Sequence, residues 1–402
     1  MTLHRLNTRL EAMKPSATLA MTAKALEKKR AGHPVIGLSA GEPDFDTPVE
    51  IADAAVAAIR AGHTHYTNNL GTPELRAAIS RTLRETCGLA YAPEEIICSN
   101  GAKQSVAQAI SALCGPGDEV IIPAPYWVSY PEMVRFAGAE PVIVPTGVDS
   151  EYLLDAEQLE QAITPATRML ILCSPSNPTG GVYSRRQMEA LVRVLRNYPD
   201  VLVLSDEIYE RIVYDAEHIS VGAFEGMWDR TITVNGFSKA YAMTGWRLGY
   251  MAAPGWMVKA ASKLQSQFTS APSSISQMAG VAALEMGPEP IDRMVAAFRE
   301  RRDVLYDALS SIPGMKCPLP QGAFYLFPDI STWLGARTPS GHVIESSEAL
   351  CVYLLDEHDV ALVPGSAFGL ESGIRISYAA SMDDIKEAAR RLKVAFSSLE
   401  TS

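Results

Sequence analysis

Short apolar runs that alternate with longer helical patterns restrict the fold of this chain more than any other feature. Each run has the length of a single strand, and the segments between the runs carry apolar residues at helical spacing. This alternation is typical of a parallel sheet whose two faces are covered by helices. The clearest predicted strands are Glu119–Ile122, Met169–Cys173, Val201–Ser205 and Thr231–Val234, and the clearest predicted helices are Gln104–Leu113 and Arg186–Arg196.

The chain after residue 290 has a different, α+β pattern. A long charged helix is followed by three strand-like runs and a final amphipathic helix. These segments are Ile291–Ser311, Ala323–Phe327, Val360–Val363, Ile374–Tyr378 and a helix that starts at Asp383. We therefore expect an α/β fold with a large domain at residues 46–290, built on a mostly parallel sheet flanked by helices. Residues 1–45 and 291–402 are expected to form a small α+β domain.

Length and charge exclude several classes of protein. The 402 residues are enough for two domains, and 47% of them are hydrophobic, as in folded globular proteins. The formal net charge is −11 and no basic run is present, so nucleic acid is not an expected partner. The chain contains no apolar run of about 18 residues, and Met1–Lys14 lacks a secretory apolar region, so we expect neither a membrane nor a secretory signal.

The cysteines and histidines give no metal pattern. The six cysteines are widely spaced, without a CxxC motif, and several lie in apolar runs. They are expected to be reduced, buried thiols of a cytoplasmic protein. The closest histidines, His63 and His65, are interpreted as part of a polar loop. Metal catalysis therefore has no support in the sequence.

Polar groups follow three of the predicted strands. Ser-Pro-Ser-Asn-Pro-Thr-Gly at 174–180 follows one strand, Asp206 to Tyr209 the next, and Asn-Gly-Phe-Ser-Lys at 235–239 a third. The carboxyl ends of parallel strands meet at one edge of a sheet, where ligands bind. A lone lysine is usually a solvated charge and an aspartate after a strand is often only a helix cap. The ordered set of Asn, Asp, Tyr, Lys and then Arg247 is what indicates a site.

A pyridoxal-phosphate (PLP) site needs this set of groups. A lysine amine forms an imine with the aldehyde and later moves a proton, and a carboxylate pairs with the pyridinium nitrogen. An aromatic face covers the ring, and helix-terminal N–H groups with a cation hold the phosphate. The sequence has a candidate for each task.

The segment 235–250, Asn-Gly-Phe-Ser-Lys-Ala-Tyr-Ala-Met-Thr-Gly-Trp-Arg-Leu-Gly-Tyr, resembles the PLP-attachment signature of class-I aminotransferases. The likeness is closest to the bacterial aspartate aminotransferase branch, which includes prephenate aminotransferases, and extends from Ser39–Phe45 to Ile374–Tyr378. It implies the fold type I of PLP-dependent transferases and ping-pong amino transfer, with aspartate and 2-oxoglutarate as the expected substrates. It also implies a homodimer with shared active sites.

The resemblance implies a role for each candidate. Lys239 would hold PLP as an imine and move the α-proton, and Asp206 would pair with the pyridinium nitrogen. Tyr209 and Asn177 would hydrogen-bond the phenolic oxygen, and Trp127 would stack on the ring. The residues assigned to the phosphate are Gly101, Ala102 and Lys103 at a helix start, Ser238, Arg247, and Tyr66 reaching into the neighbouring subunit. Gly236 departs from the pattern, because many relatives have a phosphate-binding hydroxyl there.

The same resemblance assigns the substrate to Arg375, Gly41, Trp127 and Asn177. The planar guanidinium of Arg375 matches the α-carboxylate, and a side chain at Gly41 would crowd the substrate. By analogy, the bonds Ala124–Pro125 and Asn177–Pro178 are expected to be cis. The cation for a side-chain carboxylate is left open among Lys14, Arg76 and a partner-chain residue.

Four other functions compete with this interpretation. Prephenate is an alternative substrate, and so are aromatic amino acids, because four tyrosines are expected near the site, Tyr66, Tyr126, Tyr130 and Tyr325. A cysteine-conjugate β-lyase is an eliminating enzyme on the same scaffold. A PLP-fold regulator without turnover is disfavoured, because the motifs begin by Ser39 and leave no room for a DNA-binding domain before them. A nicotinamide dehydrogenase is disfavoured because no GxGxxG follows the first strand.

Overall fold

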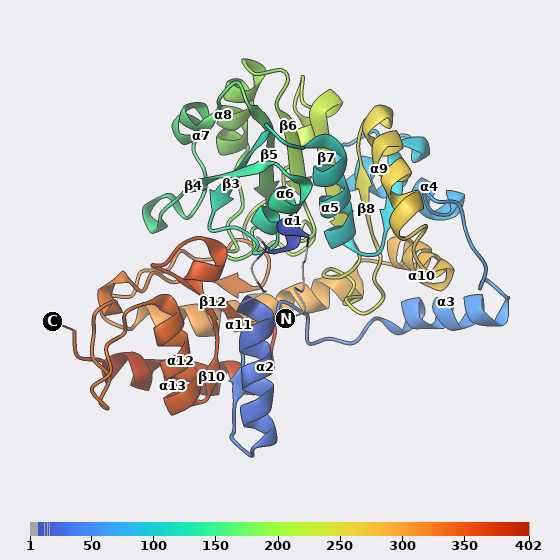
Figure 1. Ribbon diagram of the computed structural model, residues 1–402. Helices are drawn as coiled ribbons and strands as arrows, with labels where there is room; N and C mark the ends of the chain where they lie inside the picture. The colour runs from blue at the N-terminus through green and yellow to red at the C-terminus, as the bar shows by residue number, and fades with distance from the viewer. Residues whose placement is uncertain (1–6, 12, 14, 16, 402) are drawn as a thin grey trace, which may run out of the picture.

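A seven-stranded sheet is the centre of the computed structural model, which describes residues 7–401 except 12, 14 and 16 (Figure 1). Only β8 runs antiparallel to its neighbours, so the predicted mostly parallel α/β sheet is confirmed. The strands, in spatial order, are β2 (Ile96–Ser99), β8 (Gly249–Ala252), β7 (Thr231–Gly236), β6 (Leu202–Asp206), β5 (Thr167–Cys173), β3 (Glu119–Ala124) and β4 (Glu140–Pro145).

Both faces of this sheet are buried, which is why its strands read as unbroken apolar runs. Successive side chains point to opposite faces: Met169 and Ile171 of β5 pack in one cluster, whereas Leu170 and Leu172 pack in another. The first cluster is covered by helices α5, α6 and α9, and the second by α8. The β2–β8 end of the sheet packs on α4 and α10.

The helices alternate with the strands as predicted. Those before β9 are α1 (Thr8–Glu11), α2 (Ala17–Arg30), α3 (Val49–Arg60), α4 (Pro73–Cys87), α5 (Ala102–Leu113), α6 (Tyr130–Ala137), α7 (Ala156–Ala162), α8 (Arg185–Arg196), α9 (Gly255–Phe268), α10 (Ser274–Glu285) and α11 (Glu289–Ser310). Those after it are α12 (Ser347–His358) and α13 (Met382–Ser397). Single 3₁₀ turns lie at Pro93–Glu95, Val148–Ser150, Val221–Ala223, Trp228–Arg230, Ser331–Trp333 and Gly365–Phe368.

Local sequence signals determine where several helices begin and end. The Thr72 side chain accepts a hydrogen bond from Leu75 N at the start of α4, Pro73 occupies the first turn, and Gly88 ends the helix with a φ of 68°. Ser184 and Gln187 form a capping box at the start of α8. The first turn of each helix is therefore anchored by its own sequence.

The chain after α11 forms two smaller sheets. Strands β11 (Val363–Pro364), β12 (Ile374–Ser377) and β9 (Tyr325–Leu326) make an antiparallel sheet, while β10 (Val360–Ala361) pairs in parallel with β1 (Ile36–Gly37) near the other end of the chain. The predicted single run Val360–Val363 is thus two short strands in two sheets. Leu362 separates β10, which pairs with β1, from β11, which pairs with β12. Helix α13 packs on α11 and α12 beside these sheets (Figure 1).

Two N-terminal helices pack on different parts of the molecule. Helix α2 contacts β10 and β11, whereas α3 extends away from that part and packs on α10 (Figure 1). The outer face of α3 exposes Val49 and Ile59, with 63% and 53% of their surface accessible. Among the described residues, no helix is both long and apolar enough to cross a membrane.

Gly249 provides a direct test of this packing. A Cβ at Gly249 would lie 2.3 Å from Ala102 N and 2.6 Å from the Gly101 carbonyl carbon, so β8 and the start of α5 would have to separate. We expect Gly249→Ala to lower the free energy of unfolding by about 1–3 kcal/mol, measured by urea denaturation. Gly255→Ala is the matched control, because a Cβ there meets no atom within 4 Å and alanine favours the helix. Equal stability of both variants would contradict this packing.

Candidate active site

A cavity of about 410 Å³ lies where β5, β6 and β7 end. It is the place that the polar segments after these strands predict, because the carboxyl ends of parallel strands share one edge. The predicted residues that line it are Gly41, Ala102, Lys103, Trp127, Asn177, Asp206, Tyr209, Ser238, Lys239, Arg247 and Arg375. The structure thus brings together residues from nearly the whole length of the chain.

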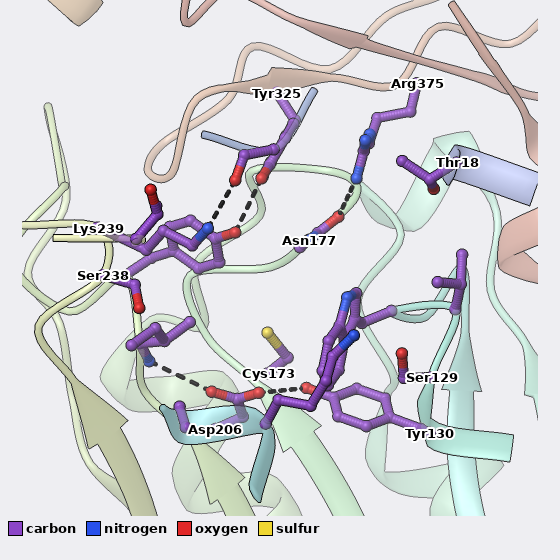
Figure 2. Close-up of a pocket in the computed structure, with 18 of the residues that line it drawn as sticks. Thr18, Ser129, Tyr130, Cys173, Asn177, Asp206, Ser238, Lys239, Tyr325 and Arg375 are labelled. Carbon is purple, nitrogen blue, oxygen red and sulfur yellow. Dashed lines mark hydrogen bonds between the residues drawn. The ribbon is translucent and has the colours of Figure 1, made fainter. Parts of the chain in front are cut away.

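Lys239 follows β7 and its side chain ends in the cavity (Figure 2). Its Nζ donates a hydrogen bond of 2.6 Å to the Gly41 carbonyl oxygen. Burial, together with the charges of Arg375 and Arg247, lowers the pKa of Lys239 to about 8, although Glu42 acts in the opposite direction. A larger fraction of this amine is therefore neutral, and nucleophilic, near neutral pH than of an ordinary lysine.

Asp206 is a buried carboxylate at the end of β6. It accepts hydrogen bonds from Tyr130 Oη at 2.7 Å and from Ile208 N at 3.3 Å (Figure 2). Burial raises the pKa of Asp206 to about 6. Within the described part of the chain, no Lys, Arg or His nitrogen forms an ion pair with it, so it can accept a cationic N–H group from a ligand.

Arg375 of β12 is buried and holds the opposite wall of the cavity. Its Nη1 donates to Asn177 Oδ1 at 3.0 Å, and its Nη2 donates to the Ser39 carbonyl oxygen at 2.6 Å. The central carbon of the guanidinium lies 4.7 Å from the Tyr325 ring centroid and 5.0 Å from that of Phe368. No ion pair neutralises it among the described residues, and its Nε has no partner there, so the group can bind a carboxylate.

An anion-binding corner lies at the start of α5. Gly101 caps this helix with a φ of 84°, and a Cβ at Gly101 would lie 2.4 Å from an Arg247 Nη atom. Only glycine lets the guanidinium approach the helix terminus so closely. Ser238 lines the same cavity, and the Lys103 ammonium lies 4.9 Å from the Trp127 ring centroid. The helix terminus and these cations together favour a phosphate-like anion.

The departure at Gly236 has a steric explanation. Gly236 pairs with Gly249 across β7 and β8, and a Cβ at Gly236 would lie 2.9 Å from Gly249 Cα and 3.1 Å from the Leu248 carbonyl oxygen. A serine or threonine has no room at this position, so the phosphate hydroxyl of other relatives has no equivalent here.

Two of the predicted cofactor residues do not line the cavity. Gly101 lies directly behind it, at the start of α5, whereas the Tyr66 side chain is fully exposed, at 101% of its reference area. The role of Tyr66 toward a neighbouring subunit stays a prediction. Lys14 lies outside the described residues. Arg76 does not line the cavity either: it is buried and donates to the carbonyl oxygens of Gly71 and Pro93.

Several cavity residues are absent from the predicted site. They are Thr18, Leu19, Val128, Ser129, Tyr130, Cys173, Ile208, Thr244 and Tyr325. Tyr130, expected near the site but given no role, begins α6 three residues after Trp127, and the two rings pack edge to face with centroids 5.2 Å apart. Thr18 and Tyr325 come from distant parts of the chain and have no motif of their own.

One of the two predicted cis bonds is wrong. Ala124–Pro125 is cis, as expected, but Asn177–Pro178 is not, and the second cis bond is Ser174–Pro175. Both prolines stand in the same loop after β5, and the sequence does not distinguish which of the two bonds the chain makes cis.

A group of metal-ligating side chains lies outside this cavity. One ligand atom each from Cys87, Glu207 and His218 lies within 4.8 Å of the other two. The Glu207 carboxylate already accepts hydrogen bonds from Ser205 and Ser220, and one of its oxygens is 3.1 Å from His218 Nε2. The sequence spacing gave no sign of this group, because Cys87 is far from the other two along the chain.

The fold and the cavity define an α/β enzyme in which a buried amine and a carboxylate without an ion-pair partner among the described residues line one cavity beside a helix N-terminus. The sequence pattern of the aminotransferase class I and II family matches residues 33–392. The chain therefore belongs to the class I and II aminotransferase family, and its fold is the type I fold of aspartate aminotransferases.

Similar proteins cover nearly the whole chain. A bifunctional aspartate aminotransferase and glutamate/aspartate-prephenate aminotransferase of Petunia hybrida is 56% identical over 97% of this chain and 82% of its own length. An aspartate/prephenate aminotransferase of Nitrosomonas europaea is 47% identical over 96% of this chain and 98% of its own. The crystal structure of the aspartate aminotransferase from Rhizobium meliloti aligns with a TM-score of 0.95 at 46% identity, covering 98% of this chain and 100% of that one.

The raised pKa of Asp206 predicts a pH-dependent stability of the cofactor-free enzyme. A carboxyl with a pKa of about 6 when folded and 3.8 when unfolded contributes stability below pH 4 that is lost as the pH rises through 6. Asp206→Asn removes the buried charge, so we expect it to stabilise the cofactor-free enzyme by about 2–3 kcal/mol at pH 8.

The difference between Asp206→Asn and the parent should shrink toward zero below pH 4, as measured by urea denaturation at several pH values. Asp229→Asn is the matched control, because Asp229 is exposed and its replacement should give no pH-dependent gain. A constant difference across the pH range would show that ionisation of Asp206 is not its cause.

Proposed function

We propose that this protein is a PLP-dependent aminotransferase that moves an amino group from aspartate to 2-oxoglutarate by a ping-pong mechanism. The observation that carries the proposal is that Lys239 and Arg375 line the same buried cavity. The Lys239 amine, whose pKa is lowered, suits removal of the proton on the Cα of an amino acid. The Arg375 guanidinium, which has no ion-pair partner among the described residues, suits the α-carboxylate.

The residues present fit the cofactor. Asp206, buried without a cationic partner, suits the pyridinium N–H, and Trp127 offers an aromatic face. Asn177 Oδ1 is occupied by Arg375, which leaves its Nδ2 to donate to the phenolic oxygen together with Tyr209 Oη. The start of α5, Ser238 and Arg247 suit the phosphate. When bound, PLP supplies an electron sink that stabilises negative charge at the substrate Cα.

The side chains of this protein then perform the remaining tasks. Arg375 binds the α-carboxylate in a bidentate manner and so orients the Cα–H bond toward Lys239. Lys239 Nζ removes the α-proton, holds it, and releases it later in the reaction. The hydrogen bond to the Gly41 carbonyl oxygen, 2.6 Å long, fixes the amine against the substrate side of the cavity.

The names of relatives that match nearly the whole chain support a dicarboxylic substrate. The cavity lining contains four basic residues, Lys103, Lys239, Arg247 and Arg375, but only one acidic residue, Asp206. Four positive charges and one negative charge leave +3, which a phosphate dianion and one α-carboxylate balance, so the charge of the lining does not by itself select a second carboxylate. Aspartate is proposed first. Prephenate, also a dicarboxylate, is the second candidate, because relatives over nearly the full length are named aspartate/prephenate aminotransferases.

We also propose a homodimer with shared sites, two domains and a cytoplasmic location. The fully exposed Tyr66 and the apolar outer face of α3 support a second subunit that covers them.

The pairing of β1 with β10 supports a small domain that residues 1–45 and 291–402 form together, beside a large domain at 46–290.

Replacement of Lys239 tests the cofactor. We expect Lys239→Ala to lose the visible absorbance of bound PLP and to turn over slower by several orders of magnitude, because both the covalent anchor and the proton carrier are removed. Lys393→Ala, an exposed lysine on α13, is the control and should keep both properties. A Lys239→Ala variant with near-normal turnover would sink the proposal.

A half-reaction screen tests the substrate. Aspartate, glutamate, arogenate, alanine and phenylalanine are each added without an oxo acid, and conversion to the pyridoxamine absorbance is followed. We expect aspartate and glutamate to react at least about tenfold faster than alanine, since a charge-assisted pair contributes about 1.5–3 kcal/mol. Stoichiometric conversion supports transfer, whereas continuous release of pyruvate and ammonia would indicate an eliminating lyase. A response to alanine alone would rule out a dicarboxylate enzyme.

A further inference from the structure

Tyr325 contacts both the proposed cofactor side and the proposed substrate side of the cavity. It starts β9 and is fully buried, and its hydroxyl oxygen lies 2.8 Å from the hydroxyl oxygen of Tyr209. Its ring lies 4.7 Å from the central carbon of the Arg375 guanidinium. Figure 2 shows Tyr325 opposite Lys239, on the wall that also carries Arg375. One side chain therefore links two residues that serve different parts of the site.

The hydroxyls of Tyr209 and Tyr325 carry two hydrogens, but the hydrogen bond between them uses only one. Burial raises the pKa of both Tyr209 and Tyr325, so both are protonated at neutral pH. They share a single hydrogen bond, and neither hydroxyl has a second partner among the described residues. A buried O–H without an acceptor costs about 1–3 kcal/mol. The spare hydrogen therefore favours a ligand that places an acceptor oxygen in the cavity.

The position of Arg375 determines which phenol keeps the spare hydrogen. Burial raises the pKa of both groups, and Arg375 opposes that rise in both, but of the two rings it is Tyr325 that the guanidinium contacts, at 4.7 Å, so its effect is larger there. Tyr325 is thus the more acidic phenol and the better donor. Tyr209 accepts from it, and its own O–H is directed toward the cavity, strengthened by the hydrogen bond that it receives.

We propose that Tyr325 is a positioning residue with two separable parts. Its hydroxyl holds Tyr209 as a donor to the phenolic oxygen of the cofactor, and its ring supports the Arg375 guanidinium that binds the substrate carboxylate. This inference rests on the proposed function, because it takes the acceptor to be bound PLP. It adds a residue through which the two binding positions are mechanically and electrostatically connected.

Tyr325→Phe and Tyr325→Leu separate the two parts. In the PLP-loaded enzyme, the pH midpoint of the cofactor absorbance should rise by about 0.3–1 unit in Tyr325→Phe, because the donor that stabilises the phenolic oxyanion is weakened. Binding of maleate, a dicarboxylate probe, should change less than about twofold, since the ring remains. Tyr325→Leu should show the same midpoint shift and bind maleate about fivefold or more weakly, as the loss of about 1 kcal/mol from a cation–π contact implies.

A double-mutant comparison tests whether Tyr325 acts through Tyr209. Tyr209→Phe alone should raise the midpoint, and adding Tyr325→Phe to it should produce no further rise. Tyr353→Phe is the matched control: this phenol is bonded to Ser398 and His358, outside the cavity, and its loss should alter neither the midpoint nor maleate binding. A Tyr325→Phe shift that persists unchanged in the Tyr209→Phe background would overturn the proposal.

A second substitution keeps the test independent of folding. Fluorotyrosine at position 325 is nearly isosteric and more acidic, so it should move the midpoint down, opposite to Tyr325→Phe. No shift with either substitution overturns the role of Tyr325 while the wild-type absorbance band still reports bound PLP. Failure of the wild-type enzyme to show a PLP band that depends on Lys239 would instead contradict the proposed function. The two failures are therefore distinguishable.

Discussion

The Arg375 guanidinium joins three separate parts of the chain at one point. It donates to Ser39 in the segment that precedes the large sheet and to Asn177 in the loop after β5, and it lies against the rings of Tyr325 and Phe368. A buried cation requires such partners, because its desolvation costs several kcal/mol when they are missing. These contacts fix the segments at Ser39 and Arg375, from the two ends of the chain, beside the carboxyl edge of the parallel strands, where the cavity lies.

The charges of Asp206 and Lys239 oppose folding because both groups are buried, but they favour ligand binding. Burial shifts the pKa of Asp206 upward and that of Lys239 downward, so each carries its functional charge only against a desolvation penalty. A ligand that supplies a cationic N–H to Asp206, or an anion to Arg247, removes part of that penalty. Relief of this penalty adds to the affinity for a ligand of the matching charges.

Much of this site could be predicted from the sequence, for reasons that differ between residues. The strands β5, β6 and β7 are buried on both faces, so their apolar runs are unambiguous, and Asn177, Asp206 and Lys239 stand directly after them. Tyr325 carries no such marker: its importance depends on a hydroxyl contact with Tyr209 across 116 positions of the chain. The absent hydroxyl at Gly236 and the cis bond at Ser174–Pro175 likewise depend on neighbouring backbone that no local motif describes.

The charge of the cavity differs from that of the molecule as a whole. The chain carries a net charge of −11, yet four basic residues and one acidic residue line the cavity. Repulsion by the surface charge is screened beyond about 8 Å at physiological salt, whereas the buried guanidinium of Arg375 is screened far less. An anionic ligand therefore meets a weak barrier outside and a strong attraction inside. Among the described residues, the Arg375 guanidinium is held by Asn177 and Ser39 rather than by a counter-ion, so the position of the carboxylate on the ligand becomes a criterion of selection.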